Sequence, residues 1–250
     1  MRRLWTLLAS TSLVVIAIGC GADAYETRLA RTIDDIKYKK KVDDNLMPPL
    51  VKSRLEEVSV FLRPPRTLTE TKAFQLGAID TEQFDSADSF LDSKAGWTLH
   101  VLTRIRQQKA APTAKKKGPV AHGDYNKFIP DVLGIVGGVY NATDVIATQK
   151  PKTDVRKANE FKHWTIAADG KTVQVYCYRK DPFQAALVFE YASAPPAGEI
   201  EKKQLSMIEK INLCLDNLVV GPAAKSMYQG GGEPIESGGD AAAPAPATAF

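Results

Sequence analysis

The sequence predicts an α+β protein whose antiparallel sheet of about five strands is covered by helices, one of them close to the C-terminus. Three observations indicate this class. Residues 164–191 hold three consecutive strand patterns joined by turns, residues 97–106 alternate as a strand does, and residues 199–220 carry an apolar stripe at helical spacing. The 250-residue chain is 44% hydrophobic and 25% charged, a globular composition that excludes collagen-like and multispanning membrane proteins.

The N-terminus has the features of an export signal. A basic pair at positions 2 and 3 precedes an almost wholly apolar run from Leu4 to Ile18. This run is shorter than the roughly 20 residues that a membrane span needs, and it suits the apolar part of a secretory signal peptide. It ends in Ala17-Ile18-Gly19-Cys20, after which polar sequence follows at once.

These four residues resemble the lipobox of bacterial lipoproteins, in which small or aliphatic residues precede a cysteine. The resemblance implies transfer of diacylglycerol to the Cys20 sulfur, cleavage after Gly19, and acylation of the new amino group by a fatty acid such as palmitate. Two or more acyl chains hold a protein stably at a membrane. Cys20 is therefore the predicted lipid-attachment site, and the membrane is the predicted partner. The alternatives are an ordinary secretory signal with an unrelated cysteine, or a cytosolic protein with an apolar start.

The resemblance also bears on location and charge. Under the familiar sorting rule, Gly21 after the cysteine favours the periplasmic face of the outer membrane over the inner membrane. Removing residues 1–19 takes away two arginines and no acid, so the net charge falls from +4 to +2. A nearly neutral, exported chain gives no reason to expect nucleic acid as a partner.

The sequence divides into four expected segments. They are a lipoprotein signal peptide (1–19), a lipid anchor with a charged helical spacer (20–48), a single α+β domain (49–228) and a disordered Gly/Ala/Pro tail (229–250). The spacer is expected to be helical because Leu29, Ile33 and Ile36 follow the i, i+4, i+7 pattern. The tail has too few apolar side chains to offset its chain entropy by burial.

The first half of the domain contains four expected elements. A strand is expected at 58–63, before a proline pair, and a short acidic helix from Phe84 to Leu91. The strand at 97–106 places its even-numbered residues on the face that we expect to be more exposed to solvent. A buried helix is expected to start near Pro130 and to end at Gly137-Gly138.

The C-terminal half is expected to be a three-strand meander followed by a helix. The strands are 164–168, 172–180 and 185–191, and the helix runs from Glu199 to about Val220 and ends at Gly221-Pro222. This layout resembles the PsbP/Mog1-like α/β/α sandwich with a closing C-terminal helix. The resemblance concerns the fold alone, because no diagnostic motif accompanies it.

One stretch has a marked charge asymmetry. No acid occurs from Ala95 to Gly123, whereas six Lys and Arg residues lie there, including Lys115, Lys116 and Lys117 in a loop expected at 107–123. These lysines could contact an anionic lipid, a polysaccharide or an acidic partner. A solvated insertion that keeps the loop soluble is the alternative.

The two cysteines of the domain could form a disulfide. Cys177 shares a strand face with Val173 and Val175, and Cys214 lies at the edge of the apolar stripe of the C-terminal helix. If that helix covers that face, the sulfurs could approach, and an exported disulfide would persist. Two buried free thiols are the alternative. Tyr176 and Tyr178, on the opposite face of the strand, are expected to form a second core layer rather than a binding platform.

The sequence contains no recognisable catalytic or metal-binding pattern. The three histidines, at positions 100, 122 and 163, are far apart, and GxSxG, SxxK, HExxH and P-loop motifs do not occur. We therefore name no catalytic residue, metal or cofactor. We expect a lipid-anchored cell-envelope protein with a non-catalytic structural, scaffolding or partner-binding role, its partner an unknown envelope protein or polymer. The alternative is an anchored ligand-binding protein or enzyme whose site is assembled from dispersed residues.

Overall fold

The computed structural model describes residues 2–71, 73–77, 83–106, 124–141, 146–148, 159–168, 170–193 and 205–229, without the side chains of residues 2–22, 146–148 and 229. The chain forms two units, residues 1–46 and 47–250. The expected basic loop at 107–123 and nearly all of the expected tail at 229–250 lie outside the described residues.

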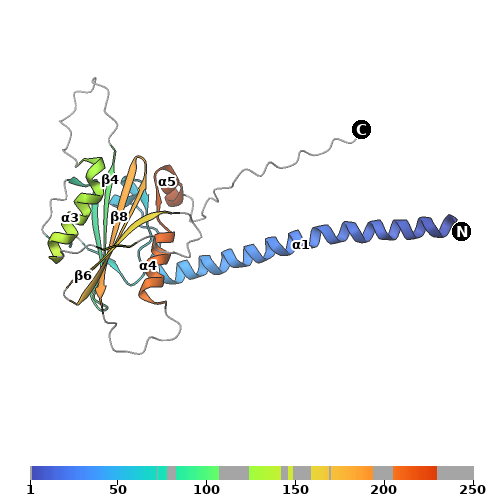
Figure 1. Cartoon of the computed structure of the whole chain (residues 1–250), viewed down its shortest axis with the longest axis horizontal. Coiled ribbons are helices and arrows are strands. Elements are labelled where there is room, and N and C mark those ends of the chain that lie inside the picture. Colours follow the sequence, from blue (N-terminus) through green and yellow to red (C-terminus); the bar gives the residue numbers. More distant parts are fainter. Residues whose placement is uncertain are drawn as a thin grey trace, which may run out of the picture. The chain divides into compact units, whose positions relative to one another are not determined.

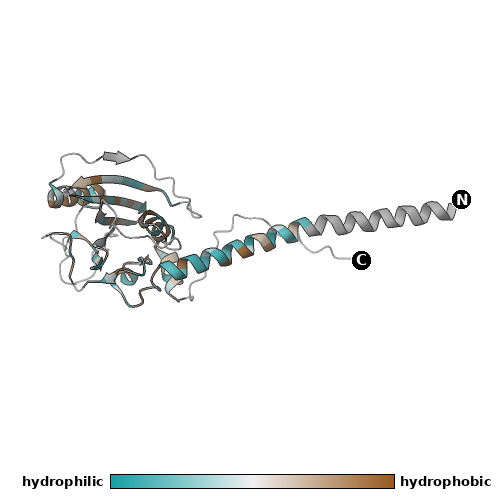
Figure 2. Ribbon diagram, turned by 90° about the horizontal axis from the view of Figure 1, so that it is seen from below, coloured by the Kyte–Doolittle hydropathy of each residue, from teal (hydrophilic) through white to brown (hydrophobic). Residues whose placement is uncertain are grey.

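The first unit consists mainly of one helix, α1 (Arg2–Asn45), which includes the expected spacer helix. Leu29, Ile33 and Ile36 are exposed on α1, and its described part is otherwise largely hydrophilic (Figure 2). Within the described residues, no helix combines the length and the apolar character that crossing a membrane requires.

The second unit contains a seven-stranded, wholly antiparallel sheet with the order β2-β3-β4-β8-β7-β6-β5 (Figure 1). Its strands are β2 (Thr69–Glu70), β3 (Ser86–Asp92), β4 (Trp97–Ile105), β5 (Ile146–Thr148), β6 (Phe161–Ala168), β7 (Lys171–Lys180) and β8 (Phe183–Ala192). The predicted α+β class and the predicted meander, β6 to β8, are confirmed. The sheet is larger than expected because β2, β3 and β5 join it.

The strand expected at 58–63 is not part of this sheet. Only Val60–Phe61 (β1) forms a strand, and it pairs with Val219–Val220 (β9) in a separate two-stranded sheet. Ser59, immediately before β1, has a φ of 57°, which breaks the extended conformation on that side. The proline pair that follows lacks the N–H groups that a longer ladder would need.

β3 replaces the short acidic helix expected from Phe84 to Leu91. Its sequence, with two serines and two aspartates, has low intrinsic strand propensity. It nevertheless pairs with β4 along its whole length, from Ser86 opposite Thr103 to Asp92 opposite Trp97. The sheet therefore supplies partners that the local sequence does not reveal.

The expected C-terminal helix is shorter and is followed by another. α4 (Met207–Asp216) begins after Ser206, which forms a capping box with Glu209. β9 comes next, and then α5 (Pro222–Gln229). Gly221 and Pro222 begin a helix rather than end one, since Gly221 takes a φ of 79° and Pro222 suits the first helical position.

Helices α3 (Phe128–Tyr140) and α4 lie on opposite sides of the sheet (Figure 1). The expected helix near Pro130 is thus confirmed, and the short 3₁₀ turn η2 (Tyr125–Lys127) leads into it. α3 buries Phe128, Val132 and Val136 against the face that includes Leu102 and Ala186. The sequence predicted that this face of β4 is the more exposed to solvent. That prediction is wrong, because α3 covers the face and its even-numbered residues from 98 to 104 are buried.

Arg104 is fully buried on this face and ties β4 to α3. Its Nη1 donates to Asp131 Oδ2 and to the Asp124 carbonyl, each at 2.7 Å, and its Nε donates to the Gln83 carbonyl at 3.2 Å. The guanidinium carbon also lies 5.1 Å and 5.4 Å from the ring centroids of Phe84 and Phe128. The buried charge is therefore held by a carboxylate, two carbonyls and two aromatic faces.

Replacing Arg104 should destabilise the domain strongly. Arg104→Met keeps an apolar stem but leaves two carbonyls and the Asp131 carboxylate without their donor, which should lower the free energy of unfolding by about 3 kcal/mol. Urea denaturation measures this change. Arg106→Met is the matched control, because Arg106 pairs with Asp181 at 49% side-chain exposure and should cost less than about 1 kcal/mol. Equal losses in the two variants would contradict the structural role of Arg104.

Candidate functional site

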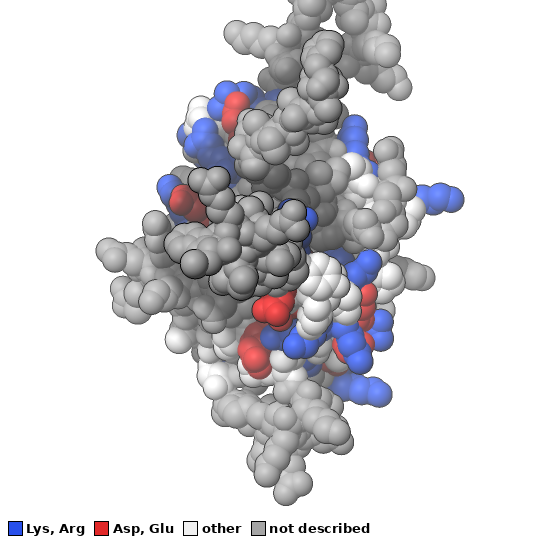
Figure 3. Space-filling view, turned by 90° about the vertical axis from the view of Figure 1, so that its right-hand side faces the viewer, with Lys and Arg blue, Asp and Glu red and all other residues white. Residues whose placement is uncertain are grey.

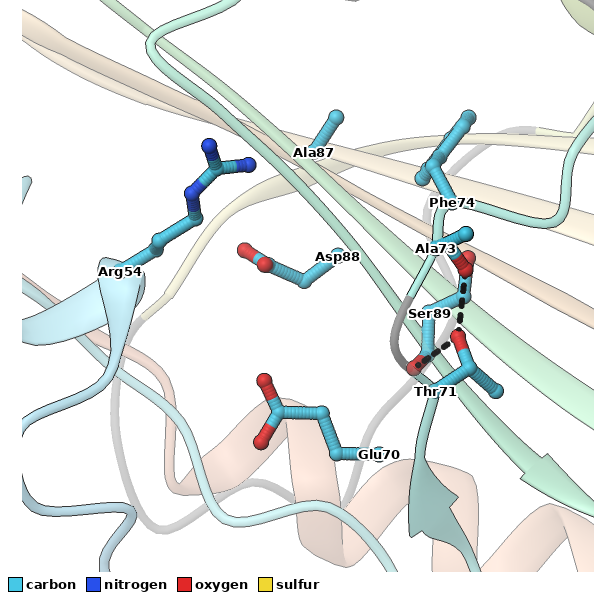
Figure 4. A pocket seen from close by; sticks show the side chains of 8 residues that line it. All are labelled: Arg54, Glu70, Thr71, Ala73, Phe74, Ala87, Asp88 and Ser89. Atoms are coloured by element: carbon cyan, nitrogen blue, oxygen red, sulfur yellow. Dashed lines mark hydrogen bonds between the residues drawn. The ribbon is translucent and has the colours of Figure 1, made fainter.

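A polar groove of about 660 Å³ borders the outer edge of β3. Helix α2 (Arg54–Glu57) begins beside it after Ser53, whose hydroxyl accepts from the Glu56 N–H. Side chains from α2, from β2 and the residues after it, and from β3 line the groove (Figure 4): Arg54, Glu70, Thr71, Ala73, Phe74, Ala87, Asp88 and Ser89.

The groove exists because β2 pairs with β3 only briefly. Thr69 and Glu70 pair with Leu91 and Phe90, and the Thr71 N–H then donates to the Ser89 carbonyl at 2.9 Å. The chain next leaves the edge, and the Gln75 N–H donates to Ser89 Oγ at 3.0 Å. Between positions 86 and 88, β3 consequently has no strand partner on this side within the described part of the chain.

Three charged side chains point into the groove. Figure 4 shows the Asp88 and Glu70 carboxylates and the Arg54 guanidinium around one open space. Burial raises the pKa of Asp88, while the hydrogen bond from the Ser86 hydroxyl and the charge of Arg54 act in the opposite direction. Two carboxylates against one guanidinium leave the groove with an excess of negative charge.

A buried chain of polar side chains leads away from the groove across the sheet. Ser89 on β3 lies opposite His100 on β4, with Oγ and Nδ1 2.8 Å apart. His100 Nε2 lies 3.9 Å from Oε2 of Glu190 on β8, which is too long for a direct hydrogen bond. Ser89 Oγ also accepts the Gln75 N–H at 3.0 Å, so this hydroxyl contacts both the groove wall and His100.

Glu190 joins this chain to α3 and β7. The Tyr140 hydroxyl, at the end of α3, donates to Glu190 Oε2 at 2.5 Å, and the Lys171 ammonium pairs with Oε1. The neighbouring His100, Lys171 and Tyr140 side chains together hold the pKa of Glu190 at about 2, against the opposing effect of burial. Burial and the adjacent Glu190 raise the pKa of Tyr140. Four elements of the domain thus meet at one carboxylate.

In serine hydrolases, a serine, a histidine and a carboxylate in this order act as the nucleophile, the general base and the group that orients the base. Ser89 and His100 are each only 1% exposed, and Ser89 Oγ is engaged by the Gln75 N–H. In this geometry the three side chains fasten β3, β4 and β8 together and position the groove wall.

The residues singled out in the sequence are placed as follows. The Cys20 side chain and the whole of Lys115, Lys116 and Lys117 lie outside the described residues. Cys177 and Cys214, considered for a disulfide, are buried free thiols in the structure. Cys177 belongs to the core under α3, whereas Cys214 is on α4, on the other side of the sheet. Burial raises the pKa of Cys177 to about 12 and also raises that of Cys214, which keeps both thiols protonated.

Of the two tyrosines of β7 predicted to form a core layer, Tyr176 is buried and Tyr178 is half-buried. Tyr176 is 3% exposed, stacks on His163 with ring centroids 4.3 Å apart, and meets Phe161 and Phe189 edge to face. Burial lowers the pKa of His163, which favours its neutral form. Within the described residues, no three His, Cys, Asp or Glu side chains gather in a way that could hold a metal ion.

The surface carries mixed charge. Figure 3 shows basic and acidic side chains next to one another on the face it presents. At one end of the sheet, Arg106 and Arg179 lie 4.5 Å and 5.1 Å from the Tyr125 ring centroid, and Arg106 also pairs with Asp181 at 3.1 Å. At this end of the sheet the charges are therefore paired with one another.

The groove residues were missed in the sequence because they share no motif. Arg54, Glu70 and Asp88 come from three separate segments, and only the brief β2–β3 pairing brings them together. Ser89, His100 and Glu190 are similarly dispersed over three strands.

Neither a known protein family nor any curated protein matches this sequence. Among solved structures, cyanobacterial PsbP (CyanoP) from Synechocystis sp. PCC 6803 is similar, with a TM-score of 0.37 and 7% sequence identity over 71% of this chain and 93% of that chain. The similarity concerns the arrangement of the elements and supports no conclusion about function.

The Glu190 carboxylate should make stability depend on acid pH. Its pKa is about 2 in the folded chain against 4.5 for an ordinary glutamate, so the unfolded chain takes up the proton first as pH falls. Its contribution is therefore complete above about pH 5 and is lost progressively toward pH 2. Glu190→Gln should flatten the pH dependence of the unfolding free energy in this window, measured by urea denaturation at several pH values. Tyr140→Phe keeps the carboxylate and should retain most of the slope; equal slopes in wild type and Glu190→Gln would contradict this role.

Proposed function

We propose that this chain is a lipid-anchored protein of a bacterial cell envelope that acts by binding a partner and not by catalysis. The support for the anchor is the sequence Ala17-Ile18-Gly19-Cys20 after a basic start and a short apolar run. The proposed location is the periplasmic face of the outer membrane, because Gly21 follows the cysteine. The membrane is engaged through acyl chains on Cys20.

The observation that carries the binding role is the groove beside β3. It is open, polar and lined from three segments, and it borders a strand edge without a partner in the described residues. One wall of the groove is already fixed, since Ser89 is hydrogen-bonded to Thr71 and to Gln75. A preformed surface of this kind suits recognition. The partner is an envelope protein or polymer.

Cys20→Ala should release the protein from the membrane. Wild type expressed in bacteria should incorporate labelled palmitate and enter the detergent phase on partitioning, and the variant should do neither, because the thiol is the acylated nucleophile. Ser12→Ala is the matched control, since it lies in the same apolar run and leaves the cysteine intact. A wild-type protein that stays wholly in the aqueous phase would end the anchor proposal.

An enzymatic function is the second candidate, and one observation favours it. Ser89, His100 and Glu190 stand in the order of a hydrolytic triad, and Ser89 borders the groove. An active enzyme would need a movement of residues 73–75 that exposes Ser89 Oγ and frees it from the Gln75 N–H.

A fluorophosphonate probe separates the two functions. Ser89 Oγ of an active triad would displace fluoride from phosphorus and retain the phosphonyl group, with His100 taking the hydroxyl proton. Under the proposed binding function, we expect wild type to remain unlabelled, like Ser89→Ala, by intact-mass measurement. Stoichiometric labelling of wild type that is lost in Ser89→Ala would replace the binding proposal with the enzymatic one.

A further inference from the structure

We infer that the groove binds an extended peptide segment carrying a lysine or arginine, which adds as a strand to the outer edge of β3. This inference rests on the proposed partner-binding function and specifies its partner: an extended, basic segment of a protein.

The first argument is the state of the strand edge. The Ser89 carbonyl faces outward, because it accepts from the Thr71 N–H and from Thr71 Oγ1, at 2.9 Å and 3.1 Å. Main-chain groups of alternate residues in an antiparallel strand face the same side, so the N–H and C=O of Ala87 also face the groove. Ala87 lines the groove, and its side of β3 has no strand partner in the described residues. An unpaired edge of this kind is a template for an added strand.

The second argument is the side-chain chemistry around that edge. Beside that edge, the Asp88 side chain lies between those of Arg54 and Glu70, so a strand added at Ala87 would meet all three charges (Figure 4). A lysine or arginine on the incoming segment would pair with the two carboxylates, and Arg54 would donate to a peptide carbonyl. Asp88 is half-buried, and an incoming cation would offset the cost of burying its charge. Phe74 and Ala73, beside Ser89, add apolar surface to the groove for the incoming segment (Figure 4).

The third argument is that the groove is fixed before binding. Ser89 is held by His100 and by the Gln75 N–H, and the Phe74 ring lies edge-on to His100 with centroids 5.6 Å apart. His100 thus positions two residues of the groove wall from within the core. Binding to such a wall loses little conformational entropy on the side of this chain.

Other occupants fit less well. A small anion would meet Asp88 and Glu70, whose charges repel it. A second copy of this chain would bring one hollow against another and leave space between them. A single extended strand supplies main-chain hydrogen bonds, a cation and a narrow cross-section together.

The experiment uses a random octapeptide library displayed on phage and selected on the full-length protein in detergent. We expect enriched sequences with a Lys or Arg between β-branched residues.

The best of these, as a blocked synthetic peptide, should bind with an affinity that falls about tenfold in Asp88→Asn, because a charge-assisted bond is lost. It should protect the Ala87 amide from hydrogen exchange, because that N–H faces the groove. N-methylation of its alternate amides should abolish binding. The matched control is Glu57→Gln, an exposed α2 position that does not line the groove.

Three outcomes would overturn the inference. They are no enrichment over an empty-micelle selection, equal binding to wild type and to Asp88→Asn, and binding that N-methylation leaves unchanged. A photo-crosslinking amino acid in place of the exposed Ala73 separates these failures from failure of the proposed function. Crosslinks to an envelope protein in cells would leave partner binding intact even if the peptide results exclude strand addition. An oligomer of this chain captured by the same crosslinker would identify a second copy as the occupant and overturn the basic-segment inference.

Discussion

Burial of both faces of the sheet at β4 and β8 is the constraint on which the polar interactions of this domain depend. Every residue of β4 except the last is buried, and β8 is buried from Gln184 to Phe189. A polar side chain placed there must find a partner inside the protein, because an unpaired buried group costs free energy. Arg104 Nη1 and Nε meet this requirement through Asp131 and two carbonyls, and His100 Nδ1 meets it through Ser89. Within the described residues, Arg104 Nη2 and His100 Nε2 are buried without a hydrogen-bond partner. The contact between Ser89 and His100 also fixes the wall of the groove.

The sequence predicted the parts of the fold that local patterns determine. The meander from β6 to β8 follows from alternating side chains and two turn sequences, and α3 follows from an apolar segment near Pro130. β3 could not be predicted in this way, because Ser86, Asp88 and Asp92 are poor strand formers. Their strand partners are supplied by β4, with which β3 pairs from Ser86 to Asp92. The split of the C-terminal helix escaped prediction for a similar reason, since β9 is defined by its pairing with β1.

The candidate site was beyond sequence reasoning for a different reason. Arg54, Glu70 and Asp88 are ordinary charged residues at unremarkable spacing, and their proximity depends on where β2 stops pairing. The lipobox-like sequence around Cys20, by contrast, is local and can be recognised in about twenty consecutive residues. The groove can be recognised only in the tertiary arrangement of dispersed residues.

The pairing of β1 with β9 has a consequence for how the second unit acquires its structure. Val60 and Phe61 pair with Val220 and Val219, and the Tyr228 hydroxyl donates to the Val60 carbonyl at 2.7 Å. These contacts join the beginning of the unit to its end, so they have a high sequence separation, and their loop-closure entropy is large. A chain emerging from the ribosome cannot form them until nearly all of it has been made. The unit should thus remain open during synthesis and close late, after the segments that hold β1 and β9 are both available.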